Sequence, residues 1–323
     1  MFPDTRMRRC RRTEGLRALS RESVIEPEHL ILPLFVVAGS GRQEPVASMP
    51  GVSRVSVDVL RRQANEFRVC AVLLFGVPEE SDKDECGSAA LREDGIVPQA
   101  LRALKAERPE VVAITDVCLC AYTSHGHCGV LSDSGELEND SSLEQLSRMA
   151  ATHAAAGADM VAPSAMTDGQ VQAIRASLDA AAFRSTAIMS YAAKFASGFY
   201  GPFREAARSA PKWGDRRSYQ LPPHNRREAI RDALLDEQEG ADWLMVKPAL
   251  PYLDVLAELR STARLPIAAY QVSGEYCMLK YAAQAGVLDE RSAALEAVLC
   301  IVRAGADAVI TYYAEAICRW IGR

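Results

Sequence analysis

The feature that most constrains the fold is a tripeptide, Gly-Ala-Asp, which occurs at residues 157–159, 240–242 and 305–307. Each copy follows a helix-like stretch and precedes a short apolar run. Glycine just past a helix end adopts the left-handed conformation without a steric penalty. A short apolar run is typical of a strand buried on both faces. The repeat therefore predicts one helix-to-strand corner that recurs along the chain.

Eight apolar runs are predicted to be strands. They are Leu30–Val37, Ala71–Phe75, Val111–Thr115, Met160–Pro163, Thr186–Tyr191, Trp243–Val246, Pro266–Val272 and Ala308–Ile310. Helical patterns separate them, and eight buried strands alternating with helices in 323 residues fit an α/β fold of the (β/α)8 TIM barrel type better than a doubly wound sheet.

Polar residues mark where the helices between these runs are expected to begin. Ser141 and Ser142 are candidate caps for one helix, and Asn225 is a candidate cap for the helix that follows it. Asp289 precedes an apolar stripe that includes Leu295 and Val298. In a barrel of this kind the chemistry gathers where the strands end. Polar side chains stand at these ends: Asp116, Cys118, Ser164, Lys194, Lys247, Ser273 and Tyr312.

Composition excludes several classes of protein. A net charge of −5 and a pI near 5.7 argue against a general nucleic-acid binder. No apolar run reaches the roughly 18 residues of a membrane span, and the charged start lacks the apolar core of an export signal. Nine cysteines, an odd number without disulfide-like spacing, fit a reducing compartment. The expected location is the cytoplasm.

The first residues differ in character from the rest. Seven arginines crowd into them: Arg6, Arg8, Arg9, Arg11, Arg12, Arg17 and Arg21. We expect residues 1–28 to form an extended arm for subunit contacts and residues 29–323 to form the catalytic barrel. A solvated tail and nucleic-acid contact are the alternative interpretations of the arm.

A cysteine-rich segment follows the third predicted strand. Cys118, Cys120 and Cys128 lie within a few residues of one another, together with His125 and His127. On an extended chain the first two sulfurs point to one side, and a glycine turn can return Cys128 to them. Three thiolates favour zinc, and the missing fourth protein ligand suggests a catalytic rather than a structural ion. The alternatives are small buried cysteines and, for the histidines, donors that support the ligands.

Two lysines stand where buried strands meet loops. Lys194 follows the run that ends at Tyr191, and Lys247 directly precedes Pro248. A lysine attacks a ketone only as the neutral amine, and burial together with a second nearby cation lowers its pKa toward neutrality. We expect both to form Schiff bases. The alternative is two unrelated lysines whose ammonium groups reach solvent at the rim of the barrel.

Ten segments together resemble a known family over nearly the whole chain. They are Met49–Val52, Arg92–Gly95, Asp116–Gly129, Ala162–Ser164, Asp168–Val171, Lys194–Ser197, Tyr200–Glu205, Gly214–Arg217, Met245–Pro248 and Tyr270–Tyr276. Their order and sequences are similar to those of the 5-aminolevulinate dehydratase (porphobilinogen synthase) family. The resemblance implies a hydro-lyase of tetrapyrrole (heme) biosynthesis. It condenses two 5-aminolevulinate molecules into the pyrrole porphobilinogen with loss of two waters.

The resemblance also implies roles for individual residues. Lys247 matches the Schiff-base lysine on the propionate side of the product, and Lys194 matches its partner on the acetate side. The three cysteines match the ligands of a catalytic zinc. The implied substrate-binding residues are Arg204, Arg216 and Gln220 for the acetate-side carboxylate, Ser273 and Tyr312 for the other carboxylate, Asp116 and Ser164 near an amine, and Phe203 and Tyr270 as apolar walls. A lid over residues 197–220 and an assembly of the homo-octamer type, with the arm embracing a neighbour, are implied as well.

The most consequential departure from the family pattern concerns a possible second metal site. Members activated by an outer magnesium ion carry Glu fifteen residues before the Schiff-base lysine, whereas this chain carries Asp232. Because the side chain is one methylene shorter, direct inheritance of a magnesium site is not expected from the match alone, and a surface carboxylate is the alternative interpretation.

Two other functions compete with the dehydratase. A Schiff-base aldolase would need one lysine and no thiolate-bound metal. A non-catalytic zinc-binding or assembly protein would depend on the arginine-rich arm instead of the lysines. Loss of activity on chelation would discriminate against the aldolase, and deletion of residues 1–21 would discriminate against the assembly protein.

Overall fold

The computed structural model describes residues 4–322 and confirms the barrel. Eight parallel strands follow one another around it: β1 (Leu30–Val37), β4 (Ala71–Val77), β5 (Val112–Val117), β6 (Met160–Pro163), β7 (Ala187–Lys194), β8 (Trp243–Lys247), β9 (Ile267–Gln271) and β10 (Ala308–Thr311). The barrel closes where β10 pairs with β1, with Leu30 opposite Val309. Each strand coincides with one of the eight predicted apolar runs.

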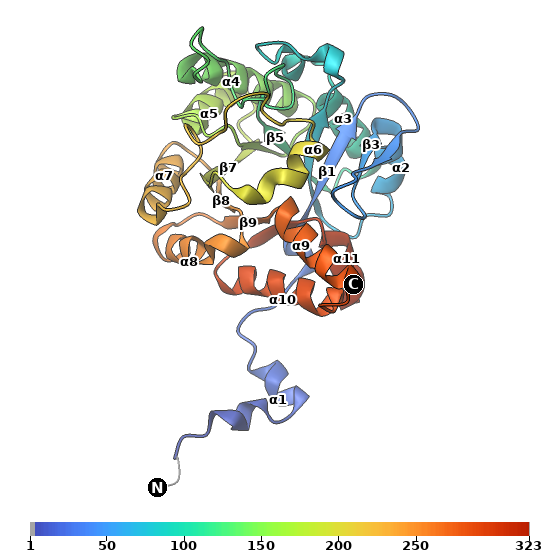
Figure 1. Cartoon of the computed structure of the whole chain (residues 1–323), viewed down its shortest axis with the longest axis vertical. Coiled ribbons are helices and arrows are strands. Elements are labelled where there is room, and N and C mark those ends of the chain that lie inside the picture. The colour runs from blue at the N-terminus through green and yellow to red at the C-terminus, as the bar shows by residue number, and fades with distance from the viewer. Residues whose placement is uncertain (1–3, 323) are drawn as a thin grey trace.

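Helices cover the outside of the barrel (Figure 1). They are α2 (Val57–Ala64), α3 (Ile96–Glu107), α4 (Asn139–Ala155), α5 (Gln170–Ala180), α7 (Arg226–Gln238), α8 (Leu253–Thr262), α9 (Ser273–Gln284), α10 (Glu290–Arg303) and α11 (Ala314–Ile321). The short α6 (Gly201–Ala206) lies instead in the long connection between β7 and β8. Within the described residues, no helix has both the length and the apolar character to cross a membrane.

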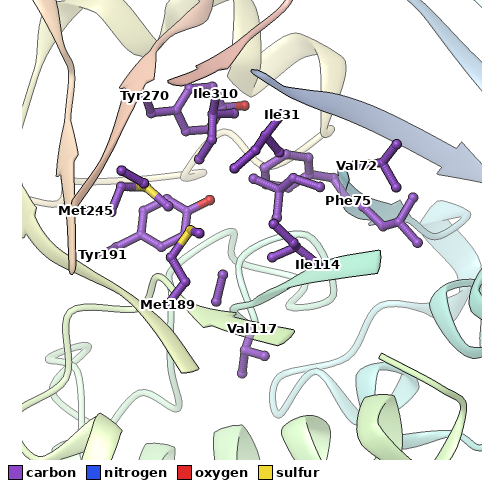
Figure 2. Packing of buried hydrophobic residues seen from close by; sticks show 14 of the residues in the cluster. Ile31, Val72, Phe75, Ile114, Val117, Met189, Tyr191, Met245, Tyr270 and Ile310 are labelled. Atoms are coloured by element: carbon purple, nitrogen blue, oxygen red, sulfur yellow. The ribbon is translucent and has the colours of Figure 1, made fainter. Parts of the chain in front are cut away.

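The barrel interior is filled by side chains from successive strands. Figure 2 shows Ile31, Ile114, Met245 and Ile310 pointing toward one another, and all four are buried. Such packing makes the centre of the barrel a solid core and leaves the strand ends for chemistry.

The Gly-Ala-Asp repeat makes the same corner three times, as predicted. The φ angles of Gly157, Gly240 and Gly305 are 102°, 101° and 119°, all in the left-handed region.

The aspartate of the repeat has a role that the sequence did not indicate. Its carboxylate accepts a hydrogen bond from a backbone N–H near the start of the preceding strand. The three bonds run from Ala113 to Asp159 at 2.7 Å, from Ile188 to Asp242 at 2.8 Å and from Ile267 to Asp307 at 2.8 Å. The repeat therefore ends a helix and also fixes the register of two neighbouring strands.

Of the predicted caps, Asp289 is confirmed, Asn225 occupies the cap position without a capping side-chain bond, and Ser141 and Ser142 are wrong. Asp289 caps α10 by accepting from the N–H of Ser292 at 2.8 Å. Ser141 and Ser142 lie inside α4, which begins earlier, at Asn139. Asn225 precedes α7 but donates to the Glu228 carboxylate at 2.6 Å, and its side chain makes no capping bond. A nearby carboxylate thus competes successfully with the backbone for the amide.

A short hairpin was not predicted. It consists of β2 (Gln43–Pro45) and β3 (Ser53–Ser56), and β3 adds to the sheet beside β1. Its strands are short and partly polar, so they lack the apolar run that reveals the barrel strands.

The arginine-rich arm extends away from the barrel (Figure 1). It contains α1 (Glu14–Leu19), and every residue from Asp4 to Ser20 is exposed. Three of its apolar side chains, Met7, Leu16 and Leu19, are among the exposed large hydrophobic residues.

Candidate active site

Six consecutive strands deliver polar side chains to one end of the barrel. Asp116 lies near the end of β5, Lys194 ends β7 and Lys247 ends β8. Ser164 directly follows β6, Tyr312 directly follows β10, and Ser273 lies two residues after the end of β9. A single cavity is lined by Asp116, Cys120, Ser164, Lys194, Tyr200, Phe203, Arg204, Arg216 and Lys247. Of the residues expected to converge at the strand ends, Asp116, Ser164, Lys194 and Lys247 share this cavity, whereas Cys118, Ser273 and Tyr312 do not line it.

The two lysines lie side by side. Lys194 and Lys247 are direct partners across the parallel pair β7 and β8, and each is 5% exposed. Because neighbouring strands run about 4.8 Å apart, their side chains rise from adjacent points on one edge of the barrel. The arrangement places two amines in one buried site.

An irregularity in β7 brings a further residue into this site. The register between β7 and β8 shifts between Ser190 and Ala193. Side chains alternate along a regular strand, so Tyr191 and Lys194 would otherwise face opposite sides. Because of the shift both reach the interior, and the Lys194 ammonium lies 5.5 Å from the centre of the Tyr191 ring.

Aromatic rings surround the Lys247 amine. Its nitrogen lies 4.4 Å from the ring centre of Tyr270, 4.9 Å from Tyr191, 5.0 Å from Phe203 and 5.3 Å from Tyr200. Burial, followed by the charge of Lys194, lowers the pKa of Lys247 to about 7. A substantial fraction of this amine is therefore neutral near pH 7 and able to act as a nucleophile.

Lys194 and Asp116 form the polar side of the cavity. The Lys194 ammonium donates to the backbone carbonyl of Ser164. Burial raises the pKa of the Asp116 carboxyl, although Lys194 and the Ser164 hydroxyl act in the opposite direction. One carboxylate oxygen of Asp116 is buried without a hydrogen-bond partner among the described residues, so it can accept a proton or a donor from a bound molecule.

The three thiols meet next to the lysines. The sulfurs of Cys118, Cys120 and Cys128 all lie within 4.8 Å of one another, and all three residues are buried. No other group of three metal-binding side chains was found in residues 4–322. The route by which they meet differs from the expectation, because β5 ends at Val117 and the cysteines lie in turns rather than on an extended chain. Gly126 has a positive φ of 77°, and the turn at this glycine helps to bring Cys128 back to the other two cysteines, as predicted.

Three donors on the lid are buried without partners, and two of the three residues, Arg204 and Arg216, line the lysine cavity, whereas Gln220 does not. The lid, residues 197–220, contains α6 and covers the cavity. The Nε atoms of Arg204 and Arg216 and the Nε2 atom of Gln220 are buried and have no hydrogen-bond partner in the described chain. Buried donors of this kind are costly unless they serve a ligand, and guanidinium and amide groups together suit a carboxylate.

Ser273 and Tyr312, the residues expected to bind the other carboxylate, already make hydrogen bonds within the protein. The Ser273 hydroxyl accepts from the N–H of Phe203 at 3.0 Å, and the Tyr312 hydroxyl lies 3.1 Å from that of Tyr270. Both hydroxyls retain further hydrogen-bonding capacity. Ser273 also starts α9, whose first turn contains the fully buried Glu275.

Glu275 fixes the loop after Lys247, a role that the sequence did not indicate. Its carboxylate accepts from the N–H groups of Leu250 at 2.6 Å, Val272 at 2.7 Å and Ala249 at 3.3 Å. Burial raises its pKa to about 7. The carboxylate therefore ties the end of β8 to the end of β9.

Asp232 lies apart from the lysine cavity. It is half-buried on α7, and burial followed by the neighbouring Asp168 and Glu228 carboxylates raises its pKa to about 6. Asp232 is therefore less exposed than the alternative interpretation as a surface carboxylate expected. That the match alone does not carry over a magnesium site stays a prediction.

Two residues of the site were not singled out from the sequence. Tyr200 begins one of the matched segments, so its position within that motif was an available signal. Tyr191 offered no such signal, because its orientation depends on the register shift in β7.

The chain was compared with known proteins. The family model for delta-aminolevulinic acid dehydratase matches residues 4–320. The delta-aminolevulinic acid dehydratase of Escherichia coli is 53% identical over 312 residues, which cover 96% of this chain and 95% of that protein. The corresponding protein of Halalkalibacterium halodurans is 50% identical over 319 residues, 98% and 96% of the two chains.

A solved structure agrees with these sequence matches. The dehydratase of Toxoplasma gondii, crystallised in complex with the reaction product porphobilinogen, has a TM-score of 0.96 and 46% identity, and the match covers 98% of this chain and 92% of that one. These matches favour the dehydratase over the aldolase and the assembly protein. The chain therefore belongs to the delta-aminolevulinic acid dehydratase family.

Proposed function

We propose that this dehydratase holds its two 5-aminolevulinate molecules through Schiff bases on Lys247 and Lys194. The reaction joins the two molecules into porphobilinogen and releases two waters. The observation that carries the proposal is the pairing of two buried lysines at the ends of β7 and β8. Holding both substrates in one site makes the bond-forming steps intramolecular, which can supply roughly 7 to 11 kcal/mol of the barrier.

Lys247 is the amine best prepared for attack. With a pKa of about 7 its neutral form adds to the substrate ketone, and loss of one water leaves a C=N bond to the lysine nitrogen. The protonated imine then withdraws electrons from the neighbouring carbons. The aromatic rings around the nitrogen exclude water from this bond and stabilise its positive charge.

Lys194 is proposed to hold the second substrate from the adjacent strand. Its bond to the Ser164 carbonyl directs the nitrogen across the cavity rather than toward solvent. The charges of Lys194 and Lys247 both act to lower the pKa of Asp116, against the effect of burial, and we propose that Asp116 transfers protons to and from the substrate amine.

Arg204, Arg216 and Gln220 are proposed to bind the acetate-side carboxylate, and Ser273 with Tyr312 the propionate-side carboxylate. Support comes from the unpaired donors on the first three residues. The cavity beneath the closed lid is only about 20 Å³, room for about one water molecule. The lid must therefore move before two substrate molecules can enter.

The cysteine cluster fits a zinc ion. Three buried sulfurs within 4.8 Å, with no carboxylate among them, form the soft donor set that zinc prefers. When bound there, zinc supplies a Lewis acid that can polarise the ketone of the second substrate. Cys120 also lines the lysine cavity, so the cluster is adjacent to the proposed reaction centre.

We further propose that the enzyme acts as a homo-oligomer of the octamer type in the cytoplasm. The exposed arm, with its arginines and its exposed Met7 and Leu19, offers a surface that a neighbouring subunit can cover. Residues 1–28 would then make subunit contacts while the barrel carries the chemistry.

Chemical trapping tests the lysine assignment. Borohydride added with 5-aminolevulinate is expected to reduce the imine and leave a stable adduct on Lys247, identified by mass spectrometry of the digested protein. The Lys247→Ala variant should fold, as judged by circular dichroism, yet form no porphobilinogen. Normal turnover in that variant would exclude the proposal.

A further inference from the structure

The lid is fastened to the cysteine loop by hydrogen bonds. We call residues 123–128 the cysteine loop. The N–H of Lys212 donates to the His125 carbonyl at 3.0 Å, and Arg216 donates to the Gly126 carbonyl at 2.9 Å. The approach is so close that a Cβ atom on Gly126 would lie 2.4 Å from the carbonyl oxygen of Ala210. The contact therefore requires glycine at this position.

His127 makes two further bonds to the lid. One ring nitrogen, Nε2, lies 3.2 Å from the carbonyl oxygen of Trp213, and the other, Nδ1, lies 3.1 Å from the Tyr219 hydroxyl. A carbonyl can only accept, so Nε2 carries the proton. In the neutral ring Nδ1 is then an acceptor, and the Tyr219 hydroxyl donates to it. Both nitrogens are thus used to hold the lid.

His125 helps to hold His127 in position. Its Nδ1 accepts from the backbone N–H of His127 at 3.0 Å, so its Nε2 carries the proton and donates to the Glu85 carbonyl at 3.1 Å. Neither histidine has a free nitrogen in this conformation. The sequence left open whether these histidines bind metal or support other groups, and the bonding favours a supporting role.

The other half of the lid is held from the barrel rim. Arg54, which is 8% exposed, donates to the backbone carbonyls of Ala206 and Glu205, both at 2.6 Å. Lys83 donates to the carbonyl of Arg208 at 2.8 Å. These bonds fix the lid as far as Arg208. Its other end is fixed where the N–H of Leu221 donates to the Lys194 carbonyl at 3.1 Å. Between these two anchors, the lid is held by the cysteine loop and by an ion pair from Lys212 to Glu80 at 3.7 Å.

We propose that His127 and Tyr219 form a latch that fastens the second half of the lid and so positions Arg216 and Gln220 over the substrate. They are positioning residues, because they act through the lid and not on the reacting atoms. This inference rests on the proposed role of Arg216 and Gln220 in binding the substrate carboxylate. It goes beyond that role by naming what keeps these two donors in place.

The least disruptive test is Tyr219→Phe, which removes one hydroxyl and keeps the ring. If the latch holds, the open lid becomes more populated by about fivefold, the change expected from losing one ordinary hydrogen bond. Trypsin should then cut after Lys212 and Arg217 about fivefold faster, because proteolysis follows the population of the open form. The side chains of both residues are already more than half exposed.

Kinetics give a second readout. Because substrate must then close the lid, the apparent KM should rise by up to about fivefold while turnover at saturation falls much less. His127→Phe should raise the cleavage rate further, since it removes two bonds. Adding Tyr219→Phe to it should change little, because both substitutions remove the same bond.

A matched control and a metal measurement separate the alternatives. Tyr281→Phe removes a hydroxyl that donates to the Ser48 carbonyl at 3.2 Å, outside the lid, and should leave cleavage unchanged. The zinc content of Tyr219→Phe must be measured as well, because the Tyr219 hydroxyl also lies against the Cys128 thiol. Unchanged lid cleavage in Tyr219→Phe and His127→Phe would overturn the latch, and so would loss of zinc as the sole effect. Failure of borohydride trapping in the wild type would instead overturn the Schiff-base proposal, and the cleavage results would still stand.

Discussion

Removal of the Lys194 charge should raise the pKa of Lys247. Burial is the first cause of the low value of about 7, and Lys194 is the second. The two residues are partners on neighbouring strands, which run about 5 Å apart. With this strand spacing taken as the separation of the two charges and an effective dielectric constant of about 20, the repulsion is about 3 kcal/mol, or about two pKa units. Lys194→Met should therefore move the pKa of Lys247 to about 9.

The sign of the effect follows from the reactive form. Only the neutral amine forms the imine, so the rate of borohydride-trapped adduct formation on Lys247 rises with pH and levels off above its pKa. In the wild type the midpoint should lie near pH 7. In Lys194→Met the neutral fraction at pH 7 should fall from about one half to about one hundredth, and the midpoint should move upward.

The assay measures the initial rate of adduct formation between pH 5.5 and about 9.5 by mass spectrometry. It does not require turnover, which Lys194→Met is expected to lose. Lys280→Met is a suitable control, because Lys280 also lies near tyrosine rings but pairs with Glu290 outside the cavity. A midpoint that stays near pH 7 in a folded Lys194→Met protein would refute the argument that one lysine lowers the pKa of the other.

Three further substitutions test the rest of the structure. Asp242→Ala removes the acceptor for the buried N–H of Ile188, so the free energy of unfolding in urea should fall by about 1 to 3 kcal/mol. Asp254→Ala, at the exposed start of α8, is the control. Cys120→Ser should lower the bound zinc per chain measured by elemental analysis, and zinc retained at the wild-type level would argue against the cysteine site. Burial lowers the pKa of His153 to about 3. Its contribution to stability is therefore present above its unfolded pKa of about 6.5 and is lost as pH falls toward 3, at about 1.4 kcal/mol per pH unit. In His153→Gln the free energy of unfolding should fall less steeply with pH in this range, and an unchanged slope would contradict the assignment.

The barrel was predictable because local patterns agree with the fold. Eight short apolar runs, three of them preceded by a glycine at a helix end, have one stable interpretation, since buried parallel strands need apolar residues on both faces. The hairpin of β2 and β3 escaped prediction because its strands are short and partly polar. The capping bonds expected from Ser142 and Asn225 do not form because each side chain found a partner other than the expected backbone N–H.

The chemically active residues were predictable by type and position along the chain. Lys194, Lys247 and the three cysteines follow predicted strands, and the closed barrel brings the ends of those strands together. Their environment was not predictable in the same way. The rings around Lys247 come from β7, β9 and the lid, which are distant in sequence.

The sequence by itself therefore determined the order of strands and helices, the chemistry of the reacting groups and the family. Only the tertiary structure decided that β7 shifts register so that Tyr191 and Lys194 share one interior, and that Lys247 is buried deeply enough to have a pKa of about 7. It also decided that His127 holds the lid through both ring nitrogens. The physical reason is that burial, hydrogen-bond partners and charge separation depend on which segments meet in space, and local sequence does not specify these distances.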